Sequence, residues 1–270
     1  MARQPGFALI FALWASLALA LIGTVLLHRL RDAAAGNTAL LREARAAAFD
    51  EAATSLAVLA LLDTSPQRRA RVDGVALRIE TMRIGANGDC PGAYEISIQD
   101  QNGLVDLNRA PPAALQKLFA AAGVDDLTAE AFAQSVLAAR TPGLANVDAL
   151  GLLPGIDAEL FARVAPAVTV FSGTDSINPQ TAPTLALRAA GLSARDADAL
   201  TARRDEHPPA GISSLPLAGG VIDPAIIPTG WVFAVRVRRL EPRAPMRETI
   251  VRFTDEPTHP VVVLAQRRLP

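Results

Sequence analysis

Residues Phe7–Leu27 read FALIFALWASLALALIGTVLL, a run of 21 positions without a charged side chain. A helix needs about 20 apolar residues to span the hydrocarbon core of a bilayer, whereas the apolar core of a secretory signal peptide has only about 7–15. The run therefore predicts a membrane-spanning helix. A signal peptide cleaved near Ala33-Ala34-Ala35 is the alternative, and the length of the run argues against it.

The helical pattern continues beyond Leu27. Apolar residues recur about every 3.6 positions as far as Leu62, while charged residues such as Arg42, Glu43 and Glu51 occupy much of the other face. This spacing predicts one helix over 7–62, about 84 Å long at about 1.5 Å per residue. The transmembrane part of this helix is expected at 7–27. The amphipathic part that follows, including the residues that stop the helix, is expected at 28–66.

Composition excludes several classes of function. The only cysteine is Cys90, so no disulfide can form within the chain and a cysteine-rich metal site is excluded. The formal net charge is −1, which gives no overall field for binding polyanions. Aromatic residues make up 4% of the chain, which argues against a surface that stacks on sugars or on single-stranded bases.

The rest of the chain predicts strands, then helices, then strands. Alternating apolar residues predict strands near 75–84, 94–98 and 104–107, and again near 231–238, 249–253 and 261–265. Between Arg109 and about Gly220 the pattern is that of short helices separated by proline and glycine. We therefore predict an α+β fold, with a long N-terminal helix packed on an antiparallel sheet and an inserted all-α domain.

The expected domain organisation follows from this pattern. The sheet domain is discontinuous and comprises 67–108 and 221–270, and the inserted α-helical domain comprises 109–220. Two sequential domains are the alternative arrangement.

A weak internal repeat marks the helical region. Leu107-Asn108-Arg109-Ala110-Pro111 is followed after 70 residues by Ile177-Asn178-Pro179-Gln180-Thr181-Ala182-Pro183. Asn108 and Asn178 are expected to hold turns by bonding to neighbouring backbone groups. Pro111 and Pro183 suit the first turn of a helix, whose N–H groups are unpaired.

Glycines and a polar cap predict where the helices of this region end and begin. Gly123 and Gly191 are expected to end the two helices that follow the repeated motifs. Ser193 is a predicted N-cap for the next helix. Pro154-Gly155 is expected to form a structural turn between helices.

The N-terminal residues resemble the type IV prepilin class, which has a short basic leader, a glycine cleavage site and an apolar helix that starts with phenylalanine. The matching residues are the leader 1–6, with Gly6 at its end, and Phe7. The resemblance implies that a prepilin peptidase cuts after Gly6 and methylates Phe7. Most such pilins carry glutamate at the fifth mature position, where this chain has Phe11. A subunit without that acid suits the tip of a fibre, where no neighbour above supplies a partner charge.

The order of motifs along the chain resembles the K-type minor pseudopilins of the bacterial general (type II) secretion pathway. The most specific block is Val168–Leu185, which contains Val170-Phe171-Ser172-Gly173 leading into Ile177-Asn178-Pro179, and Leu153-Pro154-Gly155-Ile156 comes before it. The resemblance implies a noncatalytic, single-pass protein of the inner membrane with most of its chain in the periplasm. It also implies a tip complex with minor pseudopilins I and J and contacts with other secretion-system subunits. Such a complex starts pseudopilus assembly and helps to export folded proteins across the outer membrane.

Two other functions are the alternatives. Leu153-Pro154-Gly155-Ile156 is also similar to the hairpin of membrane-anchored helix-hairpin-helix DNA receptors, but Asp157 stands where their second glycine meets a phosphate. The segment Arg109–Ala210 has eight basic and eleven acidic residues, so nucleic acid is not an expected partner. A plain anchored periplasmic adaptor is the other alternative.

No catalytic motif stands out, and we expect no enzymatic activity. The three histidines are scattered, and neither a Gly-x-Ser-x-Gly nor a His-Glu-x-x-His motif is present. No cofactor is assigned, although the family resemblance allows calcium, which binds to oxygen ligands. Acidic and amide residues near 100–108 and 175–178 are predicted to serve turns rather than to bind a metal, and no ligands are assigned.

Overall fold

The computed structural model describes residues 5–62, 70–79, 82–83, 89–90, 93–206, 230–241, 244–256 and 258–269. The fold is α+β, as predicted. The chain divides into two compact units, residues 1–51 and 52–270.

Helix α1 spans Pro5–Leu62, 58 residues that include the predicted helix 7–62. Alanine and leucine dominate it, and both favour helix. In its last turns, Ala53, Ala57 and Leu61 are buried and recur every four residues. Residues at this spacing share one face of a helix, so α1 buries one stripe within the unit 52–270.

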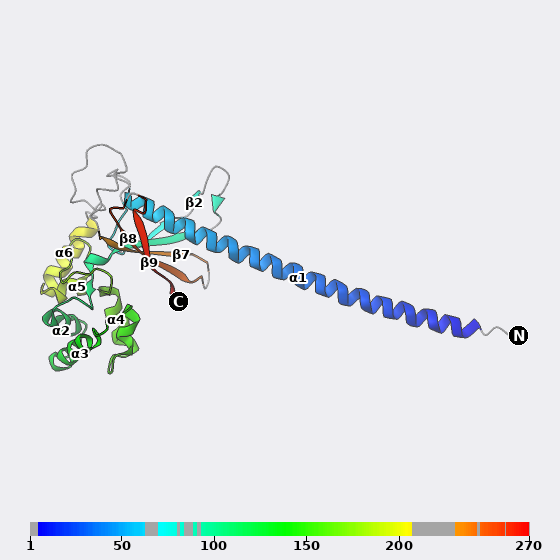
Figure 1. Cartoon of the computed structure of the whole chain (residues 1–270), viewed down its shortest axis with the longest axis horizontal. Coiled ribbons are helices and arrows are strands. Elements are labelled where there is room, and N and C mark those ends of the chain that lie inside the picture. The colour runs from blue at the N-terminus through cyan, green and yellow to red at the C-terminus, as the bar shows by residue number, and fades with distance from the viewer. Residues whose placement is uncertain are drawn as a thin grey trace. The chain divides into compact units, whose positions relative to one another are not determined.

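A five-stranded antiparallel sheet forms the second part of the fold (Figure 1). Its order is β1 (Leu77–Ile79), β4 (Tyr94–Asp100), β7 (Val232–Arg239), β8 (Met246–Phe253) and β9 (Val261–Leu269). A separate pair joins β2 (Met82–Arg83) to β3 (Asp89–Cys90). The pairing of β4 with β7 joins two segments that lie far apart in the sequence, with the helical region between them.

Both faces of the sheet are covered along β7. Val232 and Ala234 point to one face, where they cluster with Ile250, and Phe171 of the helical region packs against that cluster. Phe233, Val235 and Val237 point to the other face and are also buried. Strands buried on both faces lose the apolar–polar alternation of a half-exposed strand, which agrees with the continuous apolar run 232–235 in the first half of β7.

The predicted short strand at 104–107 does not join the main sheet. β5 (Val105–Asp106) pairs in parallel with β6 (Val168–Thr169), a two-residue strand that the sequence pattern did not indicate. This small ladder lies inside the helical region and fixes the start of its first helix.

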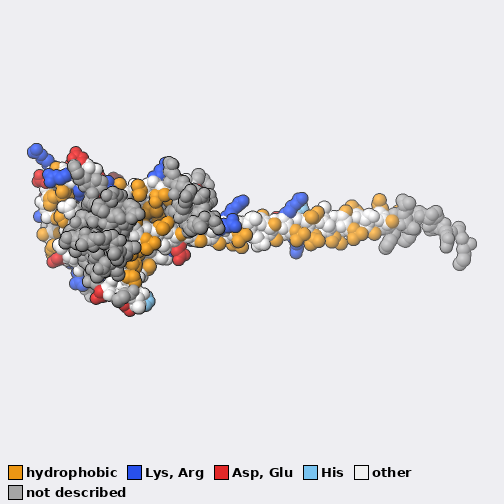
Figure 2. Space-filling model, turned by 90° about the horizontal axis from the view of Figure 1, so that it is seen from above, with side chains coloured by type: hydrophobic (Ala, Val, Ile, Leu, Met, Phe, Trp, Pro, Cys, Tyr) orange, Lys and Arg blue, Asp and Glu red, His pale blue; other side chains and the backbone are white. Residues whose placement is uncertain are grey.

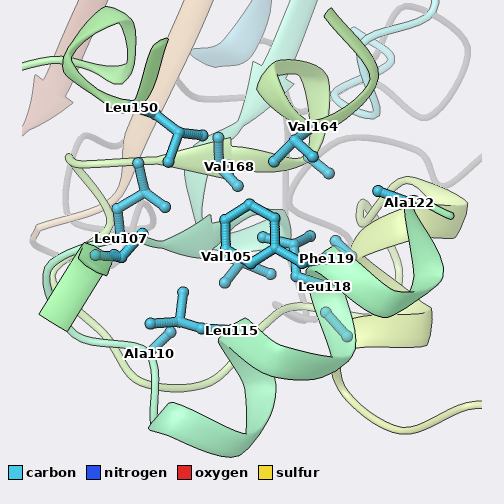
Figure 3. Close-up of a cluster of buried hydrophobic side chains, with 14 of the residues drawn as sticks. Val105, Leu107, Ala110, Leu115, Leu118, Phe119, Ala122, Leu150, Val164 and Val168 are labelled. Atoms are coloured by element: carbon cyan, nitrogen blue, oxygen red, sulfur yellow. The ribbon is translucent and has the colours of Figure 1, made fainter. Parts of the chain in front are cut away.

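The helical region contains helices α2 (Pro112–Ala121), α3 (Asp126–Ala139), α4 (Ala158–Val164), α5 (Thr184–Ala189) and α6 (Ala194–Glu206). Short 3-10 helices occur at η1 (Gln101–Gly103), η2 (Val147–Leu152) and η3 (Ala165–Ala167). Their apolar side chains meet in one core, in which Leu115, Leu118 and Phe119 of α2 are fully buried (Figure 3). The rings of Phe119 and Phe132 pack edge to face at 5.4 Å between centroids.

The helical region and the sheet belong to the same compact unit. The expected boundary near residue 66/67 and the one near 220/221 lie outside the described residues. The bounds of the sheet domain and of the inserted domain therefore stay predictions.

The two copies of the internal repeat fold in the same way. Pro111 is the N-cap of α2 and Pro183 is the N-cap of α5, so each proline precedes the first turn by one position. Each helix is followed by a glycine with positive φ, Gly123 at 95° and Gly191 at 105°. Glycine adopts this conformation at little cost and commonly ends helices there.

The second helix of each copy starts with a side-chain cap. The Asp125 carboxylate accepts a hydrogen bond from the Thr128 N–H at the start of α3. The Ser193 hydroxyl accepts one from the Asp196 N–H at the start of α6, where the sequence predicted a cap, and donates in return to the Asp196 carboxylate. Such caps satisfy backbone donors that have no partner within the helix.

Candidate functional site

The largest exposed apolar surface among the described residues lies on α1. The described part, Ala12–Leu62, is long and apolar enough to cross a membrane, with a mean hydropathy of 1.7 in its most apolar window. None of that window is buried in the structure, and Figure 2 shows hydrophobic side chains along the helix. The large apolar side chains exposed before the first charged residues are Ile10, Leu13, Trp14, Leu17, Leu19, Leu21, Ile22, Val25, Leu26 and Leu27. A soluble helix rarely exposes apolar residues all round, so this segment suits lipid or partner helices.

Polar groups inside the apolar run find partners within the helix itself. The Ser16 hydroxyl donates to the Ala12 carbonyl at 2.8 Å, and the Thr24 hydroxyl donates to the Leu21 carbonyl at 2.8 Å. An unsatisfied polar group in hydrocarbon costs several kcal/mol, and these bonds remove that cost for both hydroxyls. The run can therefore enter a bilayer without leaving either hydroxyl unpaired.

The predicted processing residues lie at the start of this helix. Gly6 and Phe7 belong to the first turn of α1, and Phe11 lies one turn further along. The leader residues 1–4 and the side chains of Phe7 and Phe11 lie outside what the structure describes. Cleavage after Gly6 and the role of Phe11 as a tip marker stay predictions.

A buried carboxylate joins the sheet to the helical region. Asp100 ends β4, and one of its oxygens accepts from Asn178 Nδ2 at 3.0 Å and from the Thr181 hydroxyl at 2.9 Å. The other oxygen accepts from the Asn102 N–H at 2.9 Å. Burial raises the pKa of Asp100, and the three hydrogen bonds oppose this shift in part. The carboxylate links segments that are 78 residues apart.

A second buried carboxylate organises the loop before the second repeat. One oxygen of Asp106 accepts from the Asn108 N–H at 2.8 Å. The other accepts from the Gly173 N–H at 2.8 Å and from the Ser172 hydroxyl at 3.1 Å. The Ser172-Gly173 pair of the most family-specific block therefore anchors its loop to the first repeat.

Ion pairs form a second connection between the sheet and the helical region, along β7, β8 and β9. Glu248 is 2% exposed and lies between Arg236 on β7, at 2.7 Å, and Arg267 on β9. Arg267 also pairs with Asp148 of η2 at 2.9 Å. This ladder crosses three strands and reaches the helical region. Arg236 and Arg267 of the C-terminal strands thus have acidic partners inside the molecule.

Asn108 acts differently from what the sequence predicts, whereas Asn178 forms the predicted turn. Asn108 does not bond to the neighbouring backbone: its amide donates to the Leu144 carbonyl and accepts from the Leu144 N–H, both at 2.9 Å and 36 residues away. Asn178 does hold its own turn, since its side-chain oxygen accepts from the Gln180 N–H at 3.0 Å. Its amide group also reaches Asp100, so both asparagines fix long-range contacts.

The Pro154-Gly155 turn connects η2 to α4. Gly155 has a φ of 86°, and a Cβ there would lie 2.9 Å from the Phe132 ring. Asp157 then caps α4, because its carboxylate accepts from the Leu160 N–H at 2.7 Å. A helix-hairpin-helix module needs these backbone donors for a phosphate, and here a carboxylate occupies the position. The Pro154-Gly155 segment forms a turn between η2 and α4, as predicted, and the Asp157 carboxylate is used to cap α4.

The oxygen-rich residues that could have held calcium face hydrogen-bond donors. Asp100 and Asp106 accept from N–H and O–H groups, which are not calcium ligands. Asp175 is exposed. Among the residues that the structure describes, no group of three or more His, Cys, Asp or Glu side chains could hold a metal ion.

Two arginines that the sequence did not single out close the repeats. Arg140 follows α3, and its Nε donates to the Leu107 carbonyl at 2.8 Å while Nη2 donates to the Ala110 carbonyl at 2.6 Å. Both carbonyls belong to the motif that starts the same copy. Arg140 thereby ties the end of the first copy to its beginning.

Arg204 plays the same part in the second copy. Its Nη2 donates to the Ala182 carbonyl at 2.6 Å and its Nη1 donates to the Gln180 carbonyl at 3.1 Å. Ala182 precedes Pro183 as Ala110 precedes Pro111, so the two arginines bind equivalent carbonyls. An arginine at the end of the second helix of each copy was a signal in the sequence, although its spacing from the glycine differs by four residues.

Neither a protein-family model nor a curated protein matches the chain.

Proposed function

We propose that the chain is a minor pseudopilin at the tip of a type II secretion pseudopilus, anchored in the inner membrane by α1 before assembly. It starts assembly with minor pseudopilins I and J and helps to export folded proteins across the outer membrane. The observation that carries the proposal is α1 itself. Its apolar part is exposed, its polar groups are satisfied internally, and its last turns are buried in an α+β body.

The role of α1 follows from its two environments. Before assembly, the run Phe7–Leu27 lies in the lipid, where exposed leucines are stable. During assembly the same surface packs against the α1 helices of partner subunits, through contacts between small and apolar side chains. Leu40 and Leu41 extend this surface beyond the apolar run, because they are 66% and 58% exposed.

The body supports a position at the end of the fibre. The helical region adds five helices to a sheet that already covers its own core, and the contacts of Asp100 and Arg267 hold this region to the sheet. We infer that an addition of this size leaves no room for a subunit stacked above it. The function is structural, and the proposal assigns no catalytic residue.

Site-specific photo-crosslinking in a host that carries the secretion genes tests the proposal. The full chain carries the photoreactive residue at Leu41 on α1 or, as the matched control, at Leu127 on α3, which is 81% exposed. The proposal predicts crosslinks from Leu41 to pseudopilins I or J and none from Leu127 to any pilin subunit. Crosslinks from both positions to the major subunit would place the chain in the shaft and contradict a tip role. Absence of any pilin crosslink from Leu41 would favour the plain adaptor.

A further inference from the structure

The open surface of the first repeat contains two guanidinium groups with no acidic partner. A depression of about 500 Å³ is lined by Asn108, Arg109, Arg140 and residues 142–145. Arg109 is exposed. Among the described residues, neither arginine forms an ion pair with a carboxylate. Two like charges side by side repel each other, and an anion between them would remove that repulsion.

Arg140 is held in place but keeps free donors. Its Nε and Nη2 donate to the carbonyls of Leu107 and Ala110, which fixes the plane of the guanidinium. Its Nη1 forms no hydrogen bond with a described residue, and Arg140 lines the depression. A fixed, planar guanidinium with an unused edge is well suited to form two parallel charge-assisted hydrogen bonds with a planar anion.

The second repeat provides an internal comparison. There the equivalent Arg204 is 6% exposed, and its Nη1 is used by the Gln180 carbonyl. Gln180 lies two positions before the alanine of the repeated alanine–proline pair. In the first copy, no carbonyl of a described residue accepts a hydrogen bond from Arg140 Nη1. The arginine thus uses Nη1 to bind a carbonyl in the second copy but not in the first. The first copy also has an additional arginine, Arg109, in the lining of the depression.

Asp106 interacts with Arg140, but its carboxylate already has hydrogen-bond donors. Burial lowers the pKa of Arg140, Asp106 opposes this shift, and Arg109 adds to it. The two oxygens of Asp106 accept from the N–H groups of Asn108 and Gly173 and from the Ser172 hydroxyl. Asp106 therefore does not fill the depression.

We propose that this depression binds a carboxylate group between the guanidinium groups of Arg109 and Arg140. A carboxylate matches the planar fork of a guanidinium, and its single charge suits a segment with eight basic and eleven acidic residues better than the double charge of phosphate does. The carboxylate comes from a free small molecule or from an acidic side chain of a protein. The site is independent of the proposed role in secretion.

Arginine-labelled full-length protein in a neutral detergent tests the site by nuclear magnetic resonance. Sodium acetate is titrated at constant ionic strength, with the Nε–H signal of Arg140 as the readout. We expect a saturable shift of this signal. In Arg109→Gln the dissociation constant rises about tenfold, which corresponds to the loss of one charged contact. The matched control Arg195→Gln removes an exposed arginine of α6 and leaves the constant unchanged.

Three results would overturn the assignment. The first is a shift that does not saturate, the second is an equal affinity in Arg109→Gln and the parent, and the third is tighter binding of inorganic phosphate than of acetate. A blocked peptide whose only carboxylate is a glutamate side chain distinguishes the sources. Tighter binding of this peptide than of acetate supports the site with a protein as the source, and equal binding supports it with a small molecule.

Discussion

At the scale of single residues, the polar side chains of this molecule connect segments that are far apart in the sequence. Asp100 meets Asn178, Asn108 meets Leu144 and Arg267 meets Asp148. The residue types indicated turns, since asparagine and aspartate favour them. Their long-range partners depend on the pairing of β4 with β7 and on how the repeats pack, which a pattern of single residues does not contain.

Replacing Asn108 should weaken the molecule without changing its helices. Asn108→Ala removes both hydrogen bonds to the Leu144 backbone and leaves a half-buried N–H and carbonyl without a partner. We expect the free energy of unfolding to fall by about 1–3 kcal/mol. Chemical denaturation of the full chain in detergent measures the difference. Asn102→Ala is the control, since the Asn102 side chain has no hydrogen bond to a described residue. Equal stability of the two variants would contradict the assigned role.

The raised pKa of Asp100 gives a pH dependence with a definite sign. The carboxyl takes up a proton in the folded state at a higher pH than in the unfolded chain, whose value is 3.8. As the pH falls from the folded-state pKa of Asp100 towards its unfolded-state pKa, the free energy of unfolding of the parent therefore rises relative to that of Asp100→Asn, which does not titrate at this position. This added stability is lost as the pH rises through the folded-state value. Unfolding curves of both proteins between pH 7 and pH 4 measure the difference, and a gap that changes in the opposite direction would refute the raised pKa.

At the scale of elements, sequence periodicity predicted the helices and strands well and their partners less well. The spacing of leucine and alanine predicted α1 to within two residues, because a helix of this length depends on local preference and a continuous apolar stripe. The alternation of apolar residues predicted the three C-terminal strands, although β8 and β9 extend beyond the predicted ranges. The parallel pairing of β5 with β6 was not predicted, because two-residue strands have no periodicity.

The Pro154-Gly155 turn depends on a glycine for two reasons that can be separated. Gly155→Ala places a side chain at a φ of 86° and brings its Cβ to 2.9 Å from the Phe132 ring. Gly173→Ala shares the positive φ, at 68°, but its Cβ would meet no atom within 4 Å. We expect a loss of about 1 kcal/mol from the backbone in both variants, and a further loss of about 1–3 kcal/mol from the contact in Gly155→Ala. Thermal unfolding compares them, and equal losses would show that the contact with Phe132 is relieved without cost.

The anchoring role of α1 predicts where a charge is tolerated. Leu17→Arg places a charge inside the apolar run, where an arginine costs about 3 kcal/mol at the centre of a bilayer. Leu41→Arg, at a similarly exposed position beyond the run, avoids this cost. Alkaline extraction of membranes should release more of the Leu17→Arg protein, while Leu41→Arg stays with the membrane like the parent. Equal retention of all three proteins would mean that the run does not anchor the chain through its apolar surface.

At the scale of the whole molecule, the sequence order of strands, helices and strands becomes one α+β unit over 52–270. The order predicted that distant strands share a sheet, and the pairing of β4 with β7 has this form. The repeat was visible as two Asn–Ala–Pro motifs, and its closing arginines became recognisable only when the hydrogen bonds of Arg140 and Arg204 were compared. The proposed role at a fibre tip depends on features of different scale: the surface of α1, the rigid junction at Asp100 and the leader before Phe7.

The most direct test of the proposed pilin-class function is the intact mass of the full chain extracted from membranes of a host with its own prepilin peptidase. The account predicts the loss of residues 1–6 and the addition of one methyl group to Phe7. A chain that keeps its N-terminus, or one cleaved near Ala35, would contradict the account and leave an anchored adaptor in its place.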